Sequence, residues 1–349
     1  MAEAIKMAIT FDPALFEIFE RGEETDKLDE VVNAGAKLVS SQSADAEANK
    51  AAADAINNLL PEVRSNIEAY AKLEEFYNDG GALSDAILKY EGIEPLFGNL
   101  QDLSDEVMVA IDEYSWTTAQ IEQAIDTLGA IVKEGIQVAW DNAVEAGAAL
   151  DEDLDISILF DQLAYTYSTT AQSNTNVPDK EWVYGDATNF KTQYGTAEVW
   201  NQYPFEVSRT LADMPAGTYT ITTKAFFRNA ANIPNIENYD PSAEAEAAVF
   251  AGHAKTPLTN VAELAQDAFE GWGEVNLTDG TKKYVPNSQK NAYDVFEDDA
   301  YTDLLQKSVT TVLTEPGDLK FGVKASEMAG DSWVVWYTFS IAYNAVDKD

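Results

Sequence analysis

Residues 199–229, VWNQYPFEVSRTLADMPAGTYTITTKAFFRN, contain two runs in which apolar residues alternate with polar ones. A period of two is typical of a β-strand with one face buried in a core. Between the runs lie residues 214–217, MPAG, and proline followed by glycine at this spacing favours a tight turn. The stretch therefore predicts an antiparallel hairpin, with Trp200, Asn201 and Arg228 at its open end.

The second half of the chain continues this pattern. Residues 309–313 and 319–323 alternate on either side of a second Pro-Gly turn and predict another hairpin. The segment 333–343 carries six large residues at every second position, which would place them on a single buried face. Many short strands separated by Pro/Gly turns indicate a β-sandwich or jelly roll.

Up to about residue 147 the apolar residues instead recur at the spacing of amphipathic helices. Thr117, followed by Gln120, has the pattern of a capping box that begins a helix. Helices are predicted for residues 26–39, 43–60 up to the proline at 61, 63–77, 83–90 and, after a loop at 92–99, 117–146. The expected fold class is multidomain α + β: a helical bundle or stalk, residues 1–150, and then an antiparallel β-sandwich, residues 151–349.

The composition narrows the classes of function. The 349 residues include 22 basic and 61 acidic side chains, a formal net charge of −39, so nucleic acid is not an expected partner. There is no cysteine, which excludes disulfides, thiolate nucleophiles and cysteine zinc sites. No segment is apolar over the roughly 18 residues that a membrane helix needs, and the first residues do not have the pattern of a signal peptide.

Residues 151–155, DEDLD, form an acidic run where the helical pattern ends. A solvated linker is the expected role. A calcium-binding edge is the alternative, because hard carboxylate oxygens are dense here, although the spacing does not match an EF-hand loop. A structural calcium ion is therefore a candidate, and no other cofactor is indicated.

The residue inventory gives little support to catalysis. The one histidine, His253, follows an apolar run without a nucleophile elbow, so neither a Ser-His-Asp triad nor a zinc site is expected. A glycosidase needs two carboxylates at a suitable separation, and among 61 acids the sequence neither identifies nor excludes such a pair. We expect no enzymatic activity, with a glycoside hydrolase or its accessory chain as the least favoured alternative.

The central stretch resembles part of a β-sandwich module of secreted, surface-attached proteins from gut Bacteroidetes. In that family an aromatic-Asn pair, a Leu/Met-Pro-Ala-Gly-x-Tyr turn and a strand ending in Phe-x-Arg follow one another, as in residues 198–229. KYVPNS at 283–288, followed by Tyr301, is similar to the family's Tyr-Val-Pro-Asn-Ser segment. The resemblance covers about residues 155–344 and implies a galactose-binding-like jelly roll that follows helical repeats.

The resemblance further implies export, carbohydrate binding, and a location outside the cell or on the outer-membrane surface. One segment departs from the family pattern, because the last strand of the family carries Asp-Asn-Phe where this chain has Tyr337-Thr338-Phe339. The missing carboxylate weakens any metal or ligand role carried over for that strand.

Sugar binding needs an aromatic face that stacks on a pyranose ring, with hydrogen-bonding groups beside it. Trp272 is the first choice, because its flanking glycines leave the ring unshielded. For Trp200 and Arg228 a structural role is favoured, since both belong to the family-wide pattern. The candidate ligand-binding residues are Trp182, Tyr184, Trp200, Asn201, Arg228, Trp272, Tyr284 and Asn287.

Two functions follow from these observations. The first is a non-catalytic secreted or cell-surface protein, in which a helical stalk presents a module that binds a glycan or glycoprotein. The second is a structural or adhesive module that binds protein or only separates other domains. An exposed aromatic platform with polar neighbours would favour the first, and a closed aromatic core with featureless loops would favour the second.

Overall fold

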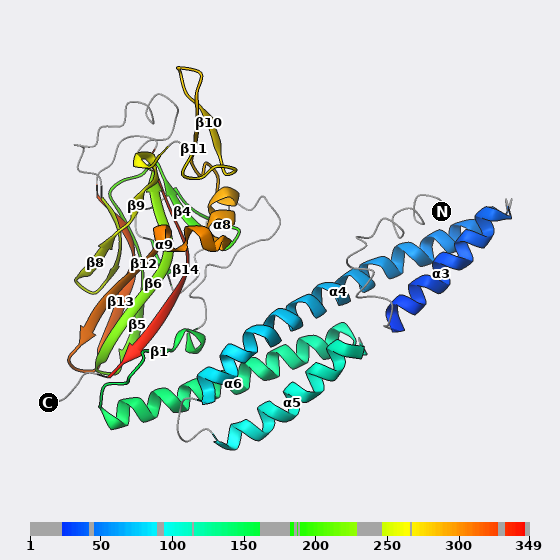
Figure 1. Ribbon diagram of the computed structural model, residues 1–349, viewed down its shortest axis with the longest axis horizontal. Helices are drawn as coiled ribbons and strands as arrows, with labels where there is room; N and C mark the ends of the chain where they lie inside the picture. Colours follow the sequence, from blue (N-terminus) through cyan, green and yellow to red (C-terminus); the bar gives the residue numbers. More distant parts are fainter. Residues whose placement is uncertain are drawn as a thin grey trace. The chain divides into compact units, whose positions relative to one another are not determined.

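The computed structural model describes residues 23–41, 45–88, 94–113, 115–160, 182–184, 187, 189–228, 246–265, 267–326 and 332–345. The chain divides into two compact units, Met1–Ala139 and Trp140–Asp349. The described part of the first unit is helical, and the second is built on antiparallel β-sheets (Figure 1). The predicted fold class, helices followed by an antiparallel β-sandwich, is confirmed. None of the described helices combines the length and the apolar character that a membrane span requires.

The described helices are α3 (Glu23–Ser40), α4 (Ala46–Leu88), α5 (Glu94–Glu113) and α6 (Thr118–Ala146). Apolar residues at helical spacing join α3 to α4. Val31 and Val32 of α3 pack against a buried stripe of α4 that consists of Ile56, Leu60, Val63 and Ile67. The helix predicted for residues 26–39 and the helix predicted for 117–146 are confirmed.

Two proline positions differ from the prediction. The helix α4 continues through Pro61, although an internal proline removes one backbone hydrogen bond. Leu60 and Val63 on either side are buried against α3, and this packing offsets the loss. The helix α5 carries Pro95 in its first turn, where proline has no helical hydrogen bond to lose. The predicted break at Pro61 is therefore wrong, and so is the predicted loop over residues 94–99, whereas residues 92–93 lie outside the described part of the chain.

The capping box before α6 is confirmed. The Thr117 N–H donates to Gln120 Oε1 at 3.0 Å, and the Gln120 N–H donates to Thr117 Oγ1 at 3.4 Å. Buried polar side chains of α4 bind Trp116, the residue just before the capping box. The Trp116 N–H donates to the Tyr70 hydroxyl at 2.7 Å, and Asn66 Nδ2 donates to Trp116 O at 3.1 Å. The connection into α6 is thus fixed by side chains of α4.

Two sheets form the sandwich of the second unit. The first, called the β6 sheet, contains β1 (Leu154–Asp155), β3 (Phe190–Gln193), β4 (Thr196–Trp200), β6 (Gly217–Arg228), β9 (Thr259–Asn260), β12 (Gln306–Leu313) and β14 (Trp333–Asn344). The second, called the β5 sheet, contains β2 (Trp182–Val183), β5 (Phe205–Met214), β7 (Ala247–Ala251), β8 (Ala254–Pro257) and β13 (Gly317–Ala325). Their strand orders are β12-β6-β14-β4-β3, with β1 on β14 and β9 on β6, and β2-β5-β13-β7-β8.

The two turns that were predicted to close hairpins carry the chain from one sheet to the other. β5 pairs with β13 and β2, whereas β6 pairs with β12 and β14, so the hairpin prediction is wrong. The second Pro-Gly turn crosses likewise between β12 and β13. The two crossings lie side by side, because Leu313 pairs with Gly217 and Gly317 pairs with Met214. Strands of a sandwich bury alternate residues whichever strand they pair with, so a period of two does not distinguish a hairpin from a crossing.

Tyrosine hydroxyls satisfy the carbonyl groups of the first crossing. Tyr219 donates to Pro215 O at 2.7 Å, and Tyr343 donates to Ala216 O at 3.1 Å. Gly217 is required at this point, because a Cβ there would lie 2.2 Å from the Tyr343 ring. The crossing is therefore packed tightly against β14.

The last strand does not keep its large residues on one face. The register of β14 against β6 shifts between Trp336 and Phe339, which marks a β-bulge. Beyond the bulge, Phe339 packs between the two sheets against Trp182 and Phe321. Before it, Trp333 lies on the opposite, outer face of the β6 sheet. The single buried face predicted for this segment is therefore wrong, and the strand contributes to two cores.

The second core covers the outer face of the β6 sheet and is called the outer cluster. Two helices cover it, α8 (Gln289–Glu297) and α9 (Thr302–Leu305). Figure 1 shows them near a two-stranded ribbon that consists of β10 (Glu274–Asn276) and β11 (Lys282–Tyr284). Its buried members are Phe226, Val261, Phe269, Ala292, Val295, Phe296, Leu305, Trp333 and Val335.

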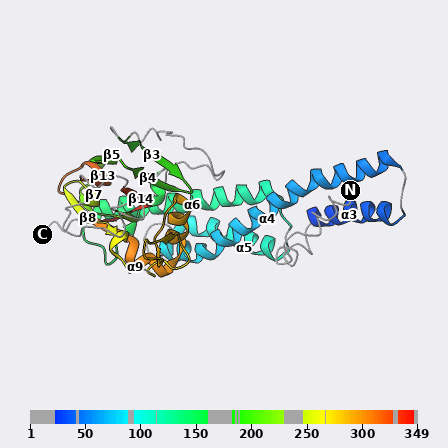
Figure 2. The same cartoon turned by 90° about the horizontal axis from the view of Figure 1, so that it is seen from above.

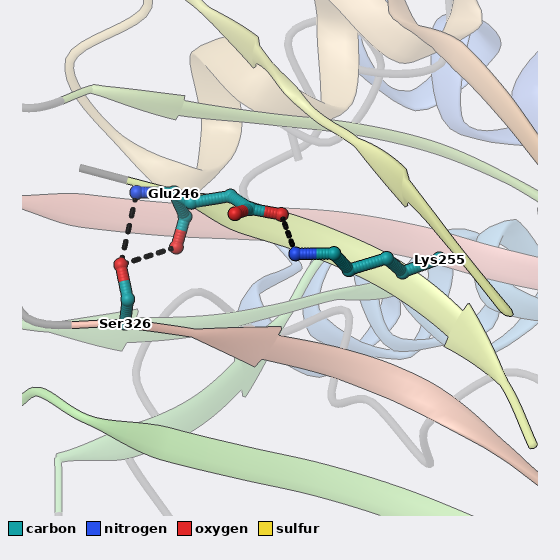
Figure 3. A network of polar contacts seen from close by, with 3 residues as sticks. All are labelled: Glu246, Lys255 and Ser326. Atoms are coloured by element: carbon teal, nitrogen blue, oxygen red, sulfur yellow. Dashed lines mark hydrogen bonds and ion pairs between the residues drawn. The ribbon is translucent and has the colours of Figure 1, made fainter. Parts of the chain in front are cut away.

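The β5 sheet is secured where β7 and β13 meet (Figure 3). The Glu246 N–H donates to Ser326 Oγ at 3.0 Å, and the Ser326 N–H donates to Glu246 O at 2.8 Å. Lys255 of β8 forms an ion pair with the Glu246 carboxylate. One residue thus joins three neighbouring strands at this edge.

The acidic run 151–155 is not a free linker, which corrects the first expectation for it. Leu154 and Asp155 form β1 on the edge of β14, and the Leu150 N–H donates to Asn344 Oδ1 at 2.8 Å. Asp153 Oδ1 accepts a hydrogen bond from Asn344 Nδ2. Among the described residues there is no group of three or more His, Cys, Asp or Glu side chains that could hold a metal ion, so the calcium alternative finds no donor cluster there.

Candidate binding site

Three side chains form a row on the outer face of the β6 sheet. Trp333, the first residue of β14, pairs with Trp200 of β4 on one side and with Arg228 of β6 on the other. Residues directly opposite each other point to the same face of a sheet, so the three side chains are neighbours. We call them the Trp200–Arg228 row. The sequence predicted that Trp200, Asn201 and Arg228 lie together at the open end of a hairpin. They do lie close together, although strand pairing with β14 and not a hairpin brings them there.

Arg228 is the buried end of the row, with 4% of its surface exposed. Its Nη1 donates to Asn287 Oδ1 at 2.6 Å and to Pro286 O at 3.3 Å, and its Cζ lies 5.3 Å from the Trp333 ring centroid. Burial lowers the pKa of Arg228 to about 10, against the opposing effects of Tyr203 and Glu198. Within the described part of the chain its Nε has no hydrogen-bond partner.

A carboxylate lies beneath the row. Glu198 is two residues before Trp200 on the same face, and its Oε2 accepts a hydrogen bond of 2.7 Å from Trp333 Nε1. Burial raises the pKa of Glu198, while the Trp333 hydrogen bond and the charges of Lys191 and Arg228 act in the opposite direction. Lys191 pairs directly with Glu198 across β3 and β4. The acid is therefore held between a hydrogen-bond donor and two cations.

Tyr203 completes the polar environment. Burial raises the pKa of Tyr203, against the attraction of Arg228. Its hydroxyl is buried, and a hydrogen bond to the backbone of Asn201 also acts against the rise in its pKa. Sequence reasoning missed both Tyr203 and Glu198 as site residues. The period of two was the available signal for Glu198, because it places this acid on the same strand face as Trp200.

The other end of the row reaches the surface. Trp200 is 43% exposed, and Asn201, the next residue, is exposed as well. Asn287 is also exposed, at the opposite end of the row beside Arg228. Asn201 has a φ of 50°, and its N–H donates to Ser332 O at 2.9 Å, which fixes the chain direction after the tryptophan. The structural role favoured for Trp200 does not agree with this exposure. An indole face with amide groups in the same region can stack on an apolar ring face and hydrogen-bond to hydroxyls.

Trp182 was the wrong choice for a stacking residue. Only 4% of its surface is exposed, and its ring lies 5.7 Å from Phe321 and 5.4 Å from Phe339 between the two sheets. A ring enclosed in this way has no free face for a sugar. Tyr184 is half-buried and stacks on Phe190 at 5.5 Å, away from the Trp200–Arg228 row.

Trp272 and Tyr284 belong to a different neighbourhood. Both are half-buried and pack against the outer cluster, which Trp333 also joins. Gly273 has a role other than baring the Trp272 ring, because a Cβ there would lie 2.0 Å from Val285 O and this glycine lets two backbone segments approach each other. At Gly271, with a φ of 97°, a Cβ would meet no atom within 4 Å. Because Trp272 is half-buried and Trp200 is exposed, Trp200 replaces it as the first choice for a stacking residue.

His253 lies exposed in the turn between β7 and β8, remote in sequence from the Trp200–Arg228 row. The groups that act on the pKa of Glu198 are burial, Trp333, Lys191 and Arg228, and none of these is a second carboxyl.

No protein-family model and no curated protein matches the chain. Among solved structures the chain is similar to a carbohydrate-binding module described as TmCBM61 in complex with β-1,4-galactotriose. The two share 11% identity over 47% of this chain and 83% of the other, with a TM-score of 0.21. At this identity and score the similarity assigns neither a family nor a ligand to this chain.

Proposed function

We propose that the sandwich unit binds a glycan at the Trp200–Arg228 row and acts without catalysis. The observation that carries this proposal is the 43% exposure of Trp200, which the exposed Asn201 follows directly in the sequence. A second exposed amide, Asn287, lies at the Arg228 end of the row. Several aliphatic side chains of the described residues are equally exposed, but an indole differs from them because its flat face and N–H suit a ligand that is apolar on one side and polar on the other. A sugar ring is such a ligand.

The charges favour a glycan that is neutral overall. The chain carries a net charge of −39, which repels polyanions at long range. Within the site, Arg228 is already engaged by Asn287 and Pro286, and Glu198 lies near Arg228 and Lys191. Lys191 and Glu198 are half-buried and pair with each other, so their charges offset, and the exposed side chains are an indole and two amides. These groups recognise hydroxyls and C–H faces rather than a formal charge.

A glycan array with the full chain tests the proposal. The wild-type protein is compared with Trp200→Ala, with Trp200→Phe, which retains a ring, and with Val183→Ala, which removes another apolar side chain that is 65% exposed. Burying one face of the indole contributes about 1–2 kcal/mol at ~25 cal/mol per Å², so Trp200→Ala should weaken binding roughly five- to thirtyfold. Trp200→Phe should retain most of the affinity, and Val183→Ala all of it.

Glycan binding that is unchanged in a folded Trp200→Ala protein would contradict the proposed site. Absence of any glycan ligand, together with capture of protein partners through Trp200, would favour the structural or adhesive alternative. Release of reducing sugars from a bound polysaccharide would contradict the non-catalytic role.

The proposal also covers the location of the protein and the role of its helical unit. We propose a secreted or outer-membrane surface protein of the Bacteroidetes type, in which the helical unit serves as a stalk. The resemblance of residues 198–229 and 283–288 to that family supports this assignment. Antibody labelling of intact source cells tests it, since an interior protein would be labelled only after the cells are broken.

A further inference from the structure

A second group of aromatic side chains lies at the other end of β4 from Trp200. Tyr194, in the turn between β3 and β4, has its ring centroid 6.3 Å from that of Tyr293 in α8. Tyr293 in turn lies 6.1 Å from Tyr337 of β14, edge to face. All three rings are half-buried, so each retains some exposed surface. We call Tyr194 and Tyr293 the tyrosine pair.

The turn and the helix that carry the tyrosine pair are fixed in place. Tyr194 and Gly195 have φ values of 53° and 69°, and a Cβ on Gly195 would lie 3.0 Å from the Tyr337 ring. The start of α8 is tied to β4, because Gln289 Nε2 donates to Thr196 Oγ1 at 3.3 Å. Both tyrosines thus project from a preorganised backbone rather than from a loose loop.

Lys290 borders both rings of the pair. Its Nζ lies 6.0 Å from the Tyr194 centroid and 5.5 Å from the Tyr293 centroid, and it forms an ion pair with Asp294. About half of the Lys290 side chain, 51%, is exposed. A flexible, exposed ammonium group can move aside from the rings or hydrogen-bond to a ligand hydroxyl that lies on them.

The strand face between Trp200 and the tyrosine pair is polar. On the outer face of β3 and β4, Lys191 pairs with Glu198 and Gln193 pairs with Thr196. β3 ends the strand order of the β6 sheet, and Figure 2 shows β3 and β4 next to each other. From Thr196 to Trp200 the strand extends roughly 13 Å at about 3.3 Å per residue. Thr196 itself is fully buried under Gln289 of α8, so the groups that reach solvent between the two aromatic surfaces are the half-buried side chains of Lys191, Gln193 and Glu198.

We propose that the outer face of β3 and β4, from Trp200 to the tyrosine pair, is an extended track that binds an internal stretch of a neutral polysaccharide chain. The inference rests on the proposed function and adds the class of ligand to it. A single terminal sugar fills the Trp200 end alone. Only an oligosaccharide that spans the strand reaches both aromatic surfaces.

Binding at two linked surfaces predicts a dependence on ligand length. Once one end of a chain stacks on Trp200, the other end meets the tyrosine pair at a high effective concentration. Affinity should therefore rise when the oligosaccharide becomes long enough to reach the pair, and then stay constant. We expect a gain of roughly tenfold between a disaccharide and the length at which the rise ends, as for one additional stacked ring.

Titration calorimetry of the full chain with cello-, xylo- and galacto-oligosaccharides of one to six units tests the track. The variants are Trp200→Ala, Tyr194→Ala, Tyr293→Ala and, as a matched control that keeps the ring, Tyr293→Phe. In at least one series the wild-type affinity should rise with length. Each tyrosine-to-alanine change should abolish that rise while leaving disaccharide binding intact, Tyr293→Phe should keep it, and Trp200→Ala should weaken binding at every length.

The outcomes separate the track from the proposed function. Equal affinity from disaccharide to hexasaccharide, with binding still dependent on Trp200, would overturn the track and leave the glycan site standing. A length dependence that survives in both folded tyrosine-to-alanine variants would also overturn the track. Absence of binding in all three series would count against both. Because Tyr293 also contacts Tyr337, thermal unfolding of each variant shows whether a loss reflects misfolding, and Tyr194→Ala provides the independent test.

Discussion

Trp333 Nε1 donates a hydrogen bond of 2.7 Å to Glu198 Oε2 across the boundary between β14 and β4. The backbone partner of Glu198 is Val335, so the bond runs diagonally to the neighbouring position on the same face. It joins the buried part of the Trp200–Arg228 row to the polar face of β3 and β4. The orientation of the Trp333 ring, over which Arg228 lies, is thereby fixed.

Replacing this acid should change how stability depends on pH. The pKa of Glu198 is raised by burial, so the folded state holds its proton more tightly than the unfolded state. Its contribution to stability is then greatest in acid and falls as the pH rises through the folded-state pKa. Glu198→Gln lacks this dependence. The free energy of unfolding of the wild type minus that of Glu198→Gln should therefore decrease between about pH 4 and pH 7.

Urea denaturation of both proteins across this range measures the difference, in which other carboxyl groups cancel. A difference that stays constant, or grows with pH, would show that Glu198 is not held as described.

Replacing Trp182 with alanine should destabilise the fold far more than replacing Trp200. Trp182→Ala removes a ring enclosed by Phe321 and Phe339, so it should lower the free energy of unfolding by about 3–5 kcal/mol. Trp200→Ala removes a ring that is 43% exposed and should cost less than about 1 kcal/mol. Chemical denaturation of the two variants compares them directly. A larger loss for Trp200→Ala would mean that this indole supports the fold rather than a ligand.

Replacing the glycine of each sheet crossing with alanine should change stability by different amounts. At Gly217 a Cβ would lie 2.2 Å from the Tyr343 ring and 2.9 Å from Asn344 O, so Gly217→Ala forces the backbone and β14 apart. We expect a destabilisation of about 2–3 kcal/mol. Gly317 is the matched control, because its nearest neighbour is Glu315 O at 3.9 Å. Gly317→Ala should be neutral, or stabilising by up to about 1 kcal/mol, in thermal unfolding. Equal losses would contradict the packing described for the first crossing.

The fragment that preserves the sandwich should begin before residue 151. The unit boundary precedes Trp140, and the Trp140 ring lies 5.9 Å from Tyr343 and 6.0 Å from Phe160. Leu150 adds a pair of hydrogen bonds with Asn344. A fragment of residues 140–349 should therefore melt at a clearly higher temperature than one of residues 151–349. Circular dichroism measures the melting temperature of each fragment. Equal melting temperatures would support the domain boundary at 150/151 that the sequence predicted.

The sequence predicted where strands and helices lie better than it predicted which strands pair with each other. Alternation identified β5, β6, β12, β13 and β14, and the capping box located the start of α6, because these signals are local. The crossings at Met214–Gly217 and the bulge after Trp336 depend on which distant strand lies alongside, and no local pattern encodes that. Pro61 misled because packing against α3 outweighed a local preference.

The candidate site was predicted in part for the same reason. Trp200, Asn201, Arg228 and Asn287 were identified from motif and composition, and the structure places them in one region. Which tryptophan is exposed depends on the depth of each ring in the sandwich. Trp182 and Trp200 each have one valine and one polar residue as sequence neighbours, and the pairing of β2 with β5 puts the first inside.

The position of β14 has a consequence for how the protein is made. β14 pairs with β6, β4 and β1 and thus lies at the centre of its sheet. A ribosome releases this strand long after β4 (Thr196–Trp200) and β6 (Gly217–Arg228), so β4 and β6 each keep an unpaired edge until residues 333–344 emerge. Long-range pairing of this kind slows folding and leaves the waiting strands open to association with other chains. Loss of β14 should accordingly abolish the whole sheet, whereas the helices, built from local contacts, can form while the chain is still growing.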